Sequence, residues 1–157
     1  MSNNGDGTFT NVTAGSGFDT FGGQSIEWTA HDFNNDGYVD IIGAGALHYN
    51  NGNMTFSADP TAPGNGAIGD LNNDGFLDIA AGGQARMSQG NDNNWIKIIP
   101  IGVQSNRNGI GARIEVVSAL GTQIRDVKSG DGFAYMSTLF AHFGIGDDTE
   151  IELVRIK

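Results

Sequence analysis

Two nine-residue stretches, residues 32–40 and 70–78, share one pattern: Asp, any residue, Asn, Asn, Asp, Gly, an aromatic residue, an aliphatic residue and Asp. The pattern brings three carboxylates into one short turn, where they repel one another by roughly kcal/mol amounts. Neither stretch contains a Lys or Arg that could balance them. The pattern therefore predicts that each turn binds a cation.

Calcium is the cation that suits this arrangement. It accepts six to eight hard oxygen ligands, and alternate residues of a turning loop supply them. The glycine at the sixth position, Gly37 or Gly75, permits the positive φ that the turn needs. Magnesium fits less well because it requires near-octahedral geometry and retains several waters. The alternative is an Asn/Asp/Gly turn without metal, but the recurrence of one spacing favours two Ca²⁺ sites.

The loops differ from an EF-hand, whose twelfth residue is a bidentate Glu and whose flanks are helices. The twelfth residues here are Gly43 and Ala81. The segments after the loops are short and apolar and end at glycines, as strands do. We therefore predict that each loop links two strands of a β-sheet, with the ninth residue as the bidentate ligand.

The charge of the chain is divided unevenly. Residues 1–85 contain ten acids and no Lys or Arg, whereas residues 86–157 contain eight of each, so the net charge of −10 belongs to the first part. Such a chain is unsuited to nucleic acid or an anionic membrane surface. It has no cysteine and no apolar run of the ~18–20 residues that a membrane span needs. Because calcium sites of modest affinity need millimolar calcium, we expect an extracellular, secreted or cell-surface location, with the signal peptide outside this chain.

Internal repetition indicates the architecture. The two loops begin 38 residues apart, and residues 3–9 and 50–56 share the pattern Asn, Asn, Gly, two residues, Thr, Phe. Period-two and short apolar segments predict strands at residues 26–31, 39–42, 46–49, about 55–56, 67–69, 77–81 and 84–88. A period near 40 residues with four short strands is typical of a propeller blade. The predicted fold is all-β, with about two four-stranded, blade-like meander repeats.

With the glycine-rich segments that follow them, the two loops resemble the FG-GAP or VCBS repeats of integrin-α-like propellers. The resemblance implies calcium binding, with side-chain ligands from positions one, three, five and nine and a backbone carbonyl from position seven. The implied ligands are Asp32, Asn34, Asp36, Tyr38 and Asp40 in the first loop and Asp70, Asn72, Asp74, Phe76 and Asp78 in the second. A closed propeller needs at least about four blades, so this chain is expected to be part of a longer array or to pack its open edges differently.

A different pattern begins at residue 94. Candidate strands are residues 95–101, 112–118, 122–128, 138–143 and 150–156, which predict a small β-sandwich or barrel-like domain. Segments 94–95, 109–113, 123–125, 130–133 and 142–146 resemble the ASPIC/UnbV domain, which follows such repeats in the CRTAC (cartilage acidic protein) family. We thus predict repeats at residues 1–88, a linker at 89–93 and an ASPIC/UnbV-like domain at 94–157 that is truncated at its C-terminal end.

No residue set in the sequence predicts catalysis. There is no thiol and no Gly-x-Ser-x-Gly elbow. His31 is predicted to be a solvent-facing strand residue, and His142 a hydrogen-bonded packing residue. Arg113, Arg125 and Lys128 are expected to pair with acids on an exposed sheet.

The predicted function is a non-enzymatic, calcium-stabilised module for binding or adhesion. Its partner is expected to be a protein or a glycan, and unclosed sheet edges favour self-association. Two alternatives remain: an accessory domain of a larger secreted enzyme, or a structural spacer in a repeat array.

Overall fold

The computed structural model describes residues 1–19, 27–104, 106–131 and 133–157. The described residues contain strands and turns and no helix, so none of them forms a helix that could cross a membrane. This confirms the all-β prediction. Residues 20–26, which include the predicted strand residue Ile26, lie outside the described residues, as do residues 105 and 132.

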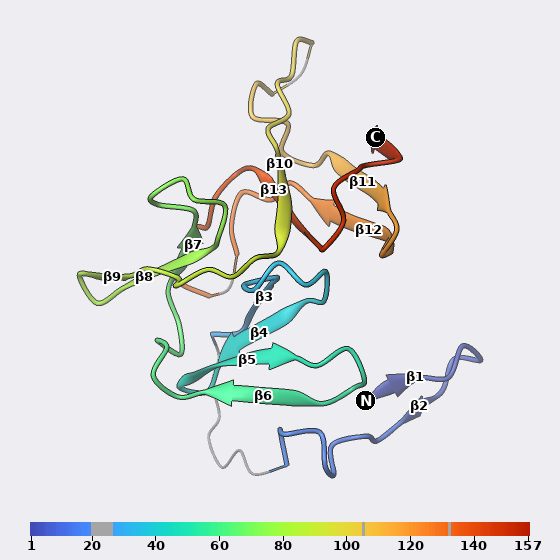
Figure 1. Cartoon of the computed structure of the whole chain (residues 1–157), viewed down its shortest axis with the longest axis vertical. Helices are drawn as coiled ribbons and strands as arrows, with labels where there is room; N and C mark the ends of the chain where they lie inside the picture. The colour runs from blue at the N-terminus through green and yellow to red at the C-terminus, as the bar shows by residue number, and fades with distance from the viewer. Residues whose placement is uncertain (20–26, 105, 132) are drawn as a thin grey trace.

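The first loop lies within a four-stranded antiparallel meander (Figure 1). Its strands, in spatial and chain order, are β3 (Thr29–His31), β4 (Asp40–Gly43), β5 (Ala46–Asn50) and β6 (Phe56–Asp59). Ile42 pairs with Thr29 on one side and with Leu47 on the other. The arrangement is the blade-like repeat that the sequence predicts.

The second loop lies within a smaller sheet of the same topology. Its strands are β7 (Ala67–Gly69), β8 (Asp78–Ala81) and β9 (Gln84–Arg86). The sheet has three strands rather than four. Before the first meander, β1 (Ser2–Asn3) and β2 (Phe9–Thr10) form a hairpin, in which Asp6 accepts hydrogen bonds from the backbone and hydroxyl of Thr8. Asp6 is thus a turn residue.

The C-terminal half consists of two small sheets. One pairs β10 (Asn94–Ile98) with β13 (Ala141–Gly146), and the other has the order β12 (Gly121–Asp126), β11 (Arg113–Ser118), β14 (Leu153–Ile156). Along β11, Ile114, Val116 and Ser118 are buried and alternate with less buried residues, as expected for a strand with one face on a core. The two sheets pack against each other, since β11 and β13 contribute side chains to one buried apolar cluster.

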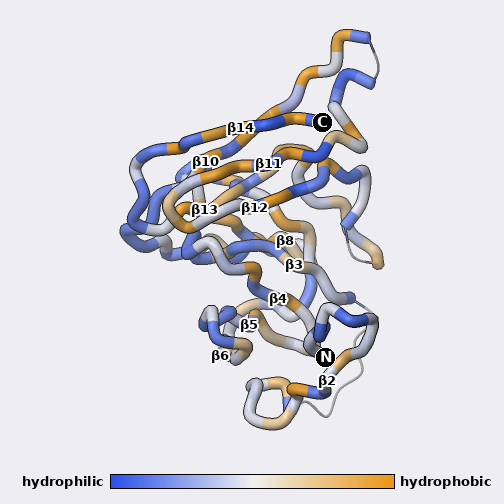
Figure 2. Tube along the Cα trace, turned by 90° about the vertical axis from the view of Figure 1, so that its right-hand side faces the viewer, coloured by the Kyte–Doolittle hydropathy of each residue, from blue (hydrophilic) through white to orange (hydrophobic). Residues whose placement is uncertain are grey.

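Two separate clusters of buried apolar side chains form the core. The first joins both repeat sheets and consists of Phe33, Ile42, Leu47, Ala62, Ile68, Leu77 and Ile79. The second lies in the C-terminal half and consists of Ile114, Val116, Val127, Ala141 and Phe143. Figure 2 shows the C-terminal sheets at one end of the molecule and the first repeat sheet with the N-terminal hairpin at the other. Both acidic loops lie where the two halves meet, since Lys97 of β10 bonds to the second loop and His142 of β13 bonds to the first.

Candidate calcium loops and the ribbon that covers them

Both acidic loops connect consecutive strands of a sheet, as predicted: residues 32–40 link β3 to β4, and residues 70–78 link β7 to β8. The first carboxylate of each loop accepts a hydrogen bond from the glycine five residues later. Gly37 N donates to Asp32 Oδ2 at 2.9 Å, and Gly75 N donates to Asp70 Oδ2 at 3.2 Å. The two glycines have φ values of 87° and 88°, so the chain turns sharply at these positions.

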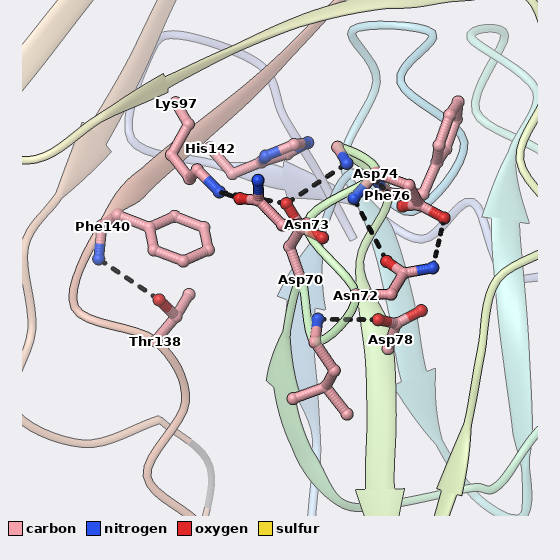
Figure 3. A network of polar contacts seen from close by, with 12 residues as sticks. Asp70, Asn72, Asn73, Asp74, Phe76, Asp78, Lys97, Thr138, Phe140 and His142 are labelled. Atoms are coloured by element: carbon pink, nitrogen blue, oxygen red, sulfur yellow. Dashed lines mark hydrogen bonds and ion pairs between the residues drawn. The ribbon is translucent and has the colours of Figure 1, made fainter.

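The third and fifth positions tighten the turn in the same way in both loops. In the first loop, Asp36 N donates to Asn34 Oδ1 at 3.2 Å, and Tyr38 N donates to Asp36 Oδ1 at 2.8 Å. The second loop repeats these bonds at 3.2 and 2.9 Å through Asn72 and Asp74 (Figure 3). The pattern depends only on local Asx turns, which explains why one sequence motif produces one loop geometry twice.

One oxygen of each leading aspartate has no hydrogen-bond partner among the described residues: Asp32 Oδ1 and Asp70 Oδ1, both buried. A buried acceptor without a partner is costly, and a buried carboxylate is costly unless it is paired. Calcium coordination would give each of these oxygens a partner. This part of the donor set therefore fits the cation that the sequence predicts.

The ninth-position aspartates have a different environment. Asp40 accepts a hydrogen bond from Phe33 N at one oxygen and from Asn50 N at the other, both at 2.8 Å. Asp78 repeats this with Leu71 N and Ser88 N, also at 2.8 Å. These carboxylates tie each loop to the following hairpin, a role that the sequence did not reveal. Their bidentate binding of calcium stays a prediction, as do the carbonyls of the aromatic residues at position seven.

Burial and like charge act together on the first loop. Burial raises the pKa of Asp32 to about 6; the Gly37 N–H opposes this rise, and the negative charge of Asp36 adds to it. Burial also raises the pKa of Asp40 to about 7, and the charges of Asp32 and Asp36 contribute. In the part of the chain that the structure describes, no three His, Asp or Glu side chains by themselves form a metal-binding group. An ion in either loop would therefore also depend on amide and backbone carbonyl oxygens.

The β10–β13 ribbon covers both loops. Lys97 on β10 and His142 on β13 are paired neighbours across the ribbon, and each contacts the fourth residue of one loop. Lys97 Nζ donates to Asn73 Oδ1 at 2.7 Å, and His142 Nε2 donates to Asn35 Oδ1 at 2.7 Å. Burial lowers the pKa of His142 to about 4, so its imidazole is neutral at physiological pH. His142 is the hydrogen-bonded packing residue that the sequence predicts.

Asn35 lies at the centre of this contact and has no exposed surface. Its side chain donates to Gly75 O of the second loop at 3.0 Å, and its own carbonyl accepts from Gly146 N at 2.8 Å. A Cβ at Gly144 would collide with Asn35, so only glycine permits this close approach of β13. All six residues of β13 are buried, because one face lies on the C-terminal core and the other lies on the first loop.

A second polar contact joins the two halves beside the first loop. His31 Nε2 donates to Asp131 Oδ2 at 2.5 Å, and both side chains are mostly buried. The prediction that His31 faces solvent was therefore wrong, since the distant segment that covers it is not evident from its neighbours in sequence. Arg113 pairs with Asp126 as predicted, whereas Arg125 is partly buried, with its guanidinium 5.2 Å from the centre of the Phe143 ring.

Two family models match the chain. One, for an FG-GAP-like repeat, matches residues 32–81, which include both loops. The other, for ASPIC and UnbV, matches residues 102–157. The chain thus contains a segment that matches an FG-GAP-like repeat, followed by a segment that matches the ASPIC/UnbV domain. No curated protein matches it.

The contact between the FG-GAP-like region and the C-terminal half depends on residues that sequence reasoning did not single out. Asn35 and Asn73 occupy the fourth position of the loops, to which the sequence analysis assigned no role, and both have left-handed φ values, 59° and 61°. Lys97 precedes the matched part of the ASPIC/UnbV domain. The only sequence signal was the presence of Asn at the fourth position of both loops.

Proposed function

We propose that this chain is an extracellular, non-enzymatic β-repeat module for binding or adhesion, in which two Ca²⁺ ions have a structural role. The observation that carries the proposal is the pair of buried, unpartnered carboxylate oxygens, Asp32 Oδ1 and Asp70 Oδ1, at equivalent positions of two equivalent loops. The residues that would hold calcium are those that the repeat resemblance implies. When bound, calcium would neutralise the crowded carboxylates and rigidify each strand-to-strand turn.

An extracellular location follows from the chemistry of this proposal. Sites of modest affinity fill only in millimolar calcium, which is an extracellular condition. The strong negative charge of the repeat region disfavours nucleic acid and anionic membranes as partners. We propose a protein or a glycan as the ligand. We also propose that the chain belongs to the CRTAC-type proteins, in which ASPIC/UnbV domains follow such repeats.

The test is a calcium titration of the whole chain by calorimetry. We expect two ions per chain, and one each for Asp36→Ala and Asp74→Ala, because each substitution removes a carboxylate from one loop. Asp6→Ala is the matched control, since Asp6 belongs to a hairpin turn outside both loops. It should leave the stoichiometry at two.

Thermal melting supplies an independent measurement. Ligand bound only by the folded state adds about 2.7 kcal/mol per site at a hundredfold excess over Kd. We therefore expect EDTA to lower Tm by several degrees. No heat of binding in millimolar calcium, together with an unchanged Tm in EDTA, would refute the calcium proposal.

A further inference from the structure

The two loops share one sequence pattern but face different partners across the β10–β13 ribbon. In the second loop, Lys97 Nζ lies 3.1 Å from Asp70 Oδ2 as well as 2.7 Å from Asn73 Oδ1 (Figure 3). The Asp70 side chain is fully buried and that of Lys97 is 17% exposed. The ammonium also lies 4.9 Å from the centre of the Phe140 ring. Lys97 is thus a fixed positive charge at the first ligand of the second loop.

Among the described residues, no ammonium group makes an equivalent contact with the first loop. The equivalent oxygen, Asp32 Oδ2, accepts from the Gly37 backbone, and the fourth residue Asn35 accepts from the imidazole of His142. Arg125 acts on Asp32 through its charge, but within the described ranges no ion pair joins the two. The loops therefore differ in one direct charge contact.

We propose that Lys97 determines the difference between the two loops as calcium sites: the first fills at lower calcium, and the second only at higher calcium. This inference rests on the proposed function. A divalent ion bound to Asp70 shares that carboxylate with an ammonium and is repelled by it. Without calcium, Lys97 already balances part of the negative charge of the second loop. Calcium binding therefore relieves less repulsion there, and its binding free energy is less favourable. Lys97 touches the ligand residue and is a specificity-determining residue of the second site.

A natural reporter lies on the second loop. A Cβ at Gly75 would fall within the indole of Trp95, so this ring packs directly on the turn. The chain has only one other tryptophan, Trp28. In a Trp28→Phe background, fluorescence therefore reports on Trp95 alone and follows the second loop.

The experiment compares calcium titrations of the whole chain carrying Lys97→Met with those of the wild type. We expect two binding steps in the wild type. In Lys97→Met, the calcium affinity of the weaker step should rise ~10-fold or more. This is the effect expected from removing the repulsion between a unit charge and a divalent ion a few ångströms away in a high dielectric. The Trp95 signal should move to lower calcium with this rise in affinity. Lys97→Arg keeps the charge and should keep two steps. Lys157→Met removes a charge on the C-terminal residue that pairs with Glu115, and should change neither step.

A second comparison does not depend on the folding of Lys97→Met. Asp74→Ala leaves only the first loop intact as a calcium site, and Asp36→Ala leaves only the second. The affinity of Asp74→Ala for its ion should therefore be higher than that of Asp36→Ala by ~10-fold or more. Equal affinities in these two variants, or a Lys97→Met titration identical to wild type, would overturn the role of Lys97 and leave calcium binding intact. Absence of calcium binding in all variants would overturn the proposed function and this inference together.

Discussion

At the scale of the residue, the same asparagine makes different contacts at equivalent positions. Asn35 and Asn73 are both the fourth residue of an acidic loop and have nearly equal φ values. Asn35 is fully buried and hydrogen-bonds to both the second loop and β13, whereas Asn73 is exposed and contacts Lys97. The local sequence sets the left-handed turn, and burial sets the energetic importance of the side chain.

We predict that Asn35→Ala destabilises the protein by about 2–3 kcal/mol more than Asn73→Ala, because it leaves a buried carbonyl and the buried His142 without their partners. Both variants place Ala at a positive φ, so the cost of that backbone conformation cancels in the difference. Denaturant unfolding of both variants in saturating calcium measures this difference in the free energy of unfolding. Equal losses of stability would mean that the Asn35 hydrogen bonds contribute nothing net.

At the scale of the element, β10 meets the second loop through an irregular strand. The register of β10 and β13 shifts between Asn94 and Trp95, as at a β-bulge, and the indole of Trp95 lies on Gly75 and stacks on His142, with 6.1 Å between ring centres. A bulge re-aims a side chain relative to a regular strand. The glycine needed for the sharp turn of the second loop is thus also the surface on which the ribbon packs.

We predict that Gly75→Ala destabilises the protein well beyond the cost of a positive φ, because its methyl group would overlap the Trp95 ring. Gly5→Ala is the control, since Gly5 has a φ of 80° and its added methyl group would meet no atom within 4 Å. That control should lose only about 1–2 kcal/mol. Denaturant unfolding supplies both values. Adding Trp95→Ala should partly restore the stability lost in Gly75→Ala, because it removes the ring that the methyl group overlaps. The packing argument would be contradicted if no stability were restored and the two glycine substitutions had equal costs.

At the scale of the whole molecule, two apolar cores are joined by a largely polar contact centred on the loops. Asn34 O accepts hydrogen bonds from Asn91 at 2.7 Å and Asn93 at 2.9 Å, and these add to the contacts of Asn35 and His31. The loops therefore belong to the interface as much as to the repeats. An ion that orders them would stabilise both halves.

We predict that chelation of calcium loosens both halves together, although the loops lie only in the repeat region. Hydrogen exchange of the whole chain with and without EDTA provides the measurement. Strands β4 and β5 should lose protection, and so should β13, whose residues contact the first loop. Loss confined to the repeat strands would show that the ribbon contact does not transmit the effect of the ion.

Much of the fold was predictable because its signals are local. Alternation and short apolar segments predicted most strands to within a few residues, and the repeated acidic pattern predicted two strand-linking loops. The roles of Asp40 and Asp78 as anchors for backbone amides were not predictable. Each bonds to a residue seven positions before it and another ten positions after it, and only the folded hairpin brings these together.

The sequence by itself determined the turn geometry, because Asp, Asn and Gly side chains and φ preferences act over a few residues and repeat wherever the pattern repeats. Only the tertiary structure decided what covers each loop. Lys97 reaches Asn73 across 24 residues and His142 reaches Asn35 across 107, and both contacts depend on the pairing of β10 with β13 and on how that ribbon packs. Two identical motifs thus acquired different electrostatic environments, because the field at a site comes from whatever the fold places beside it.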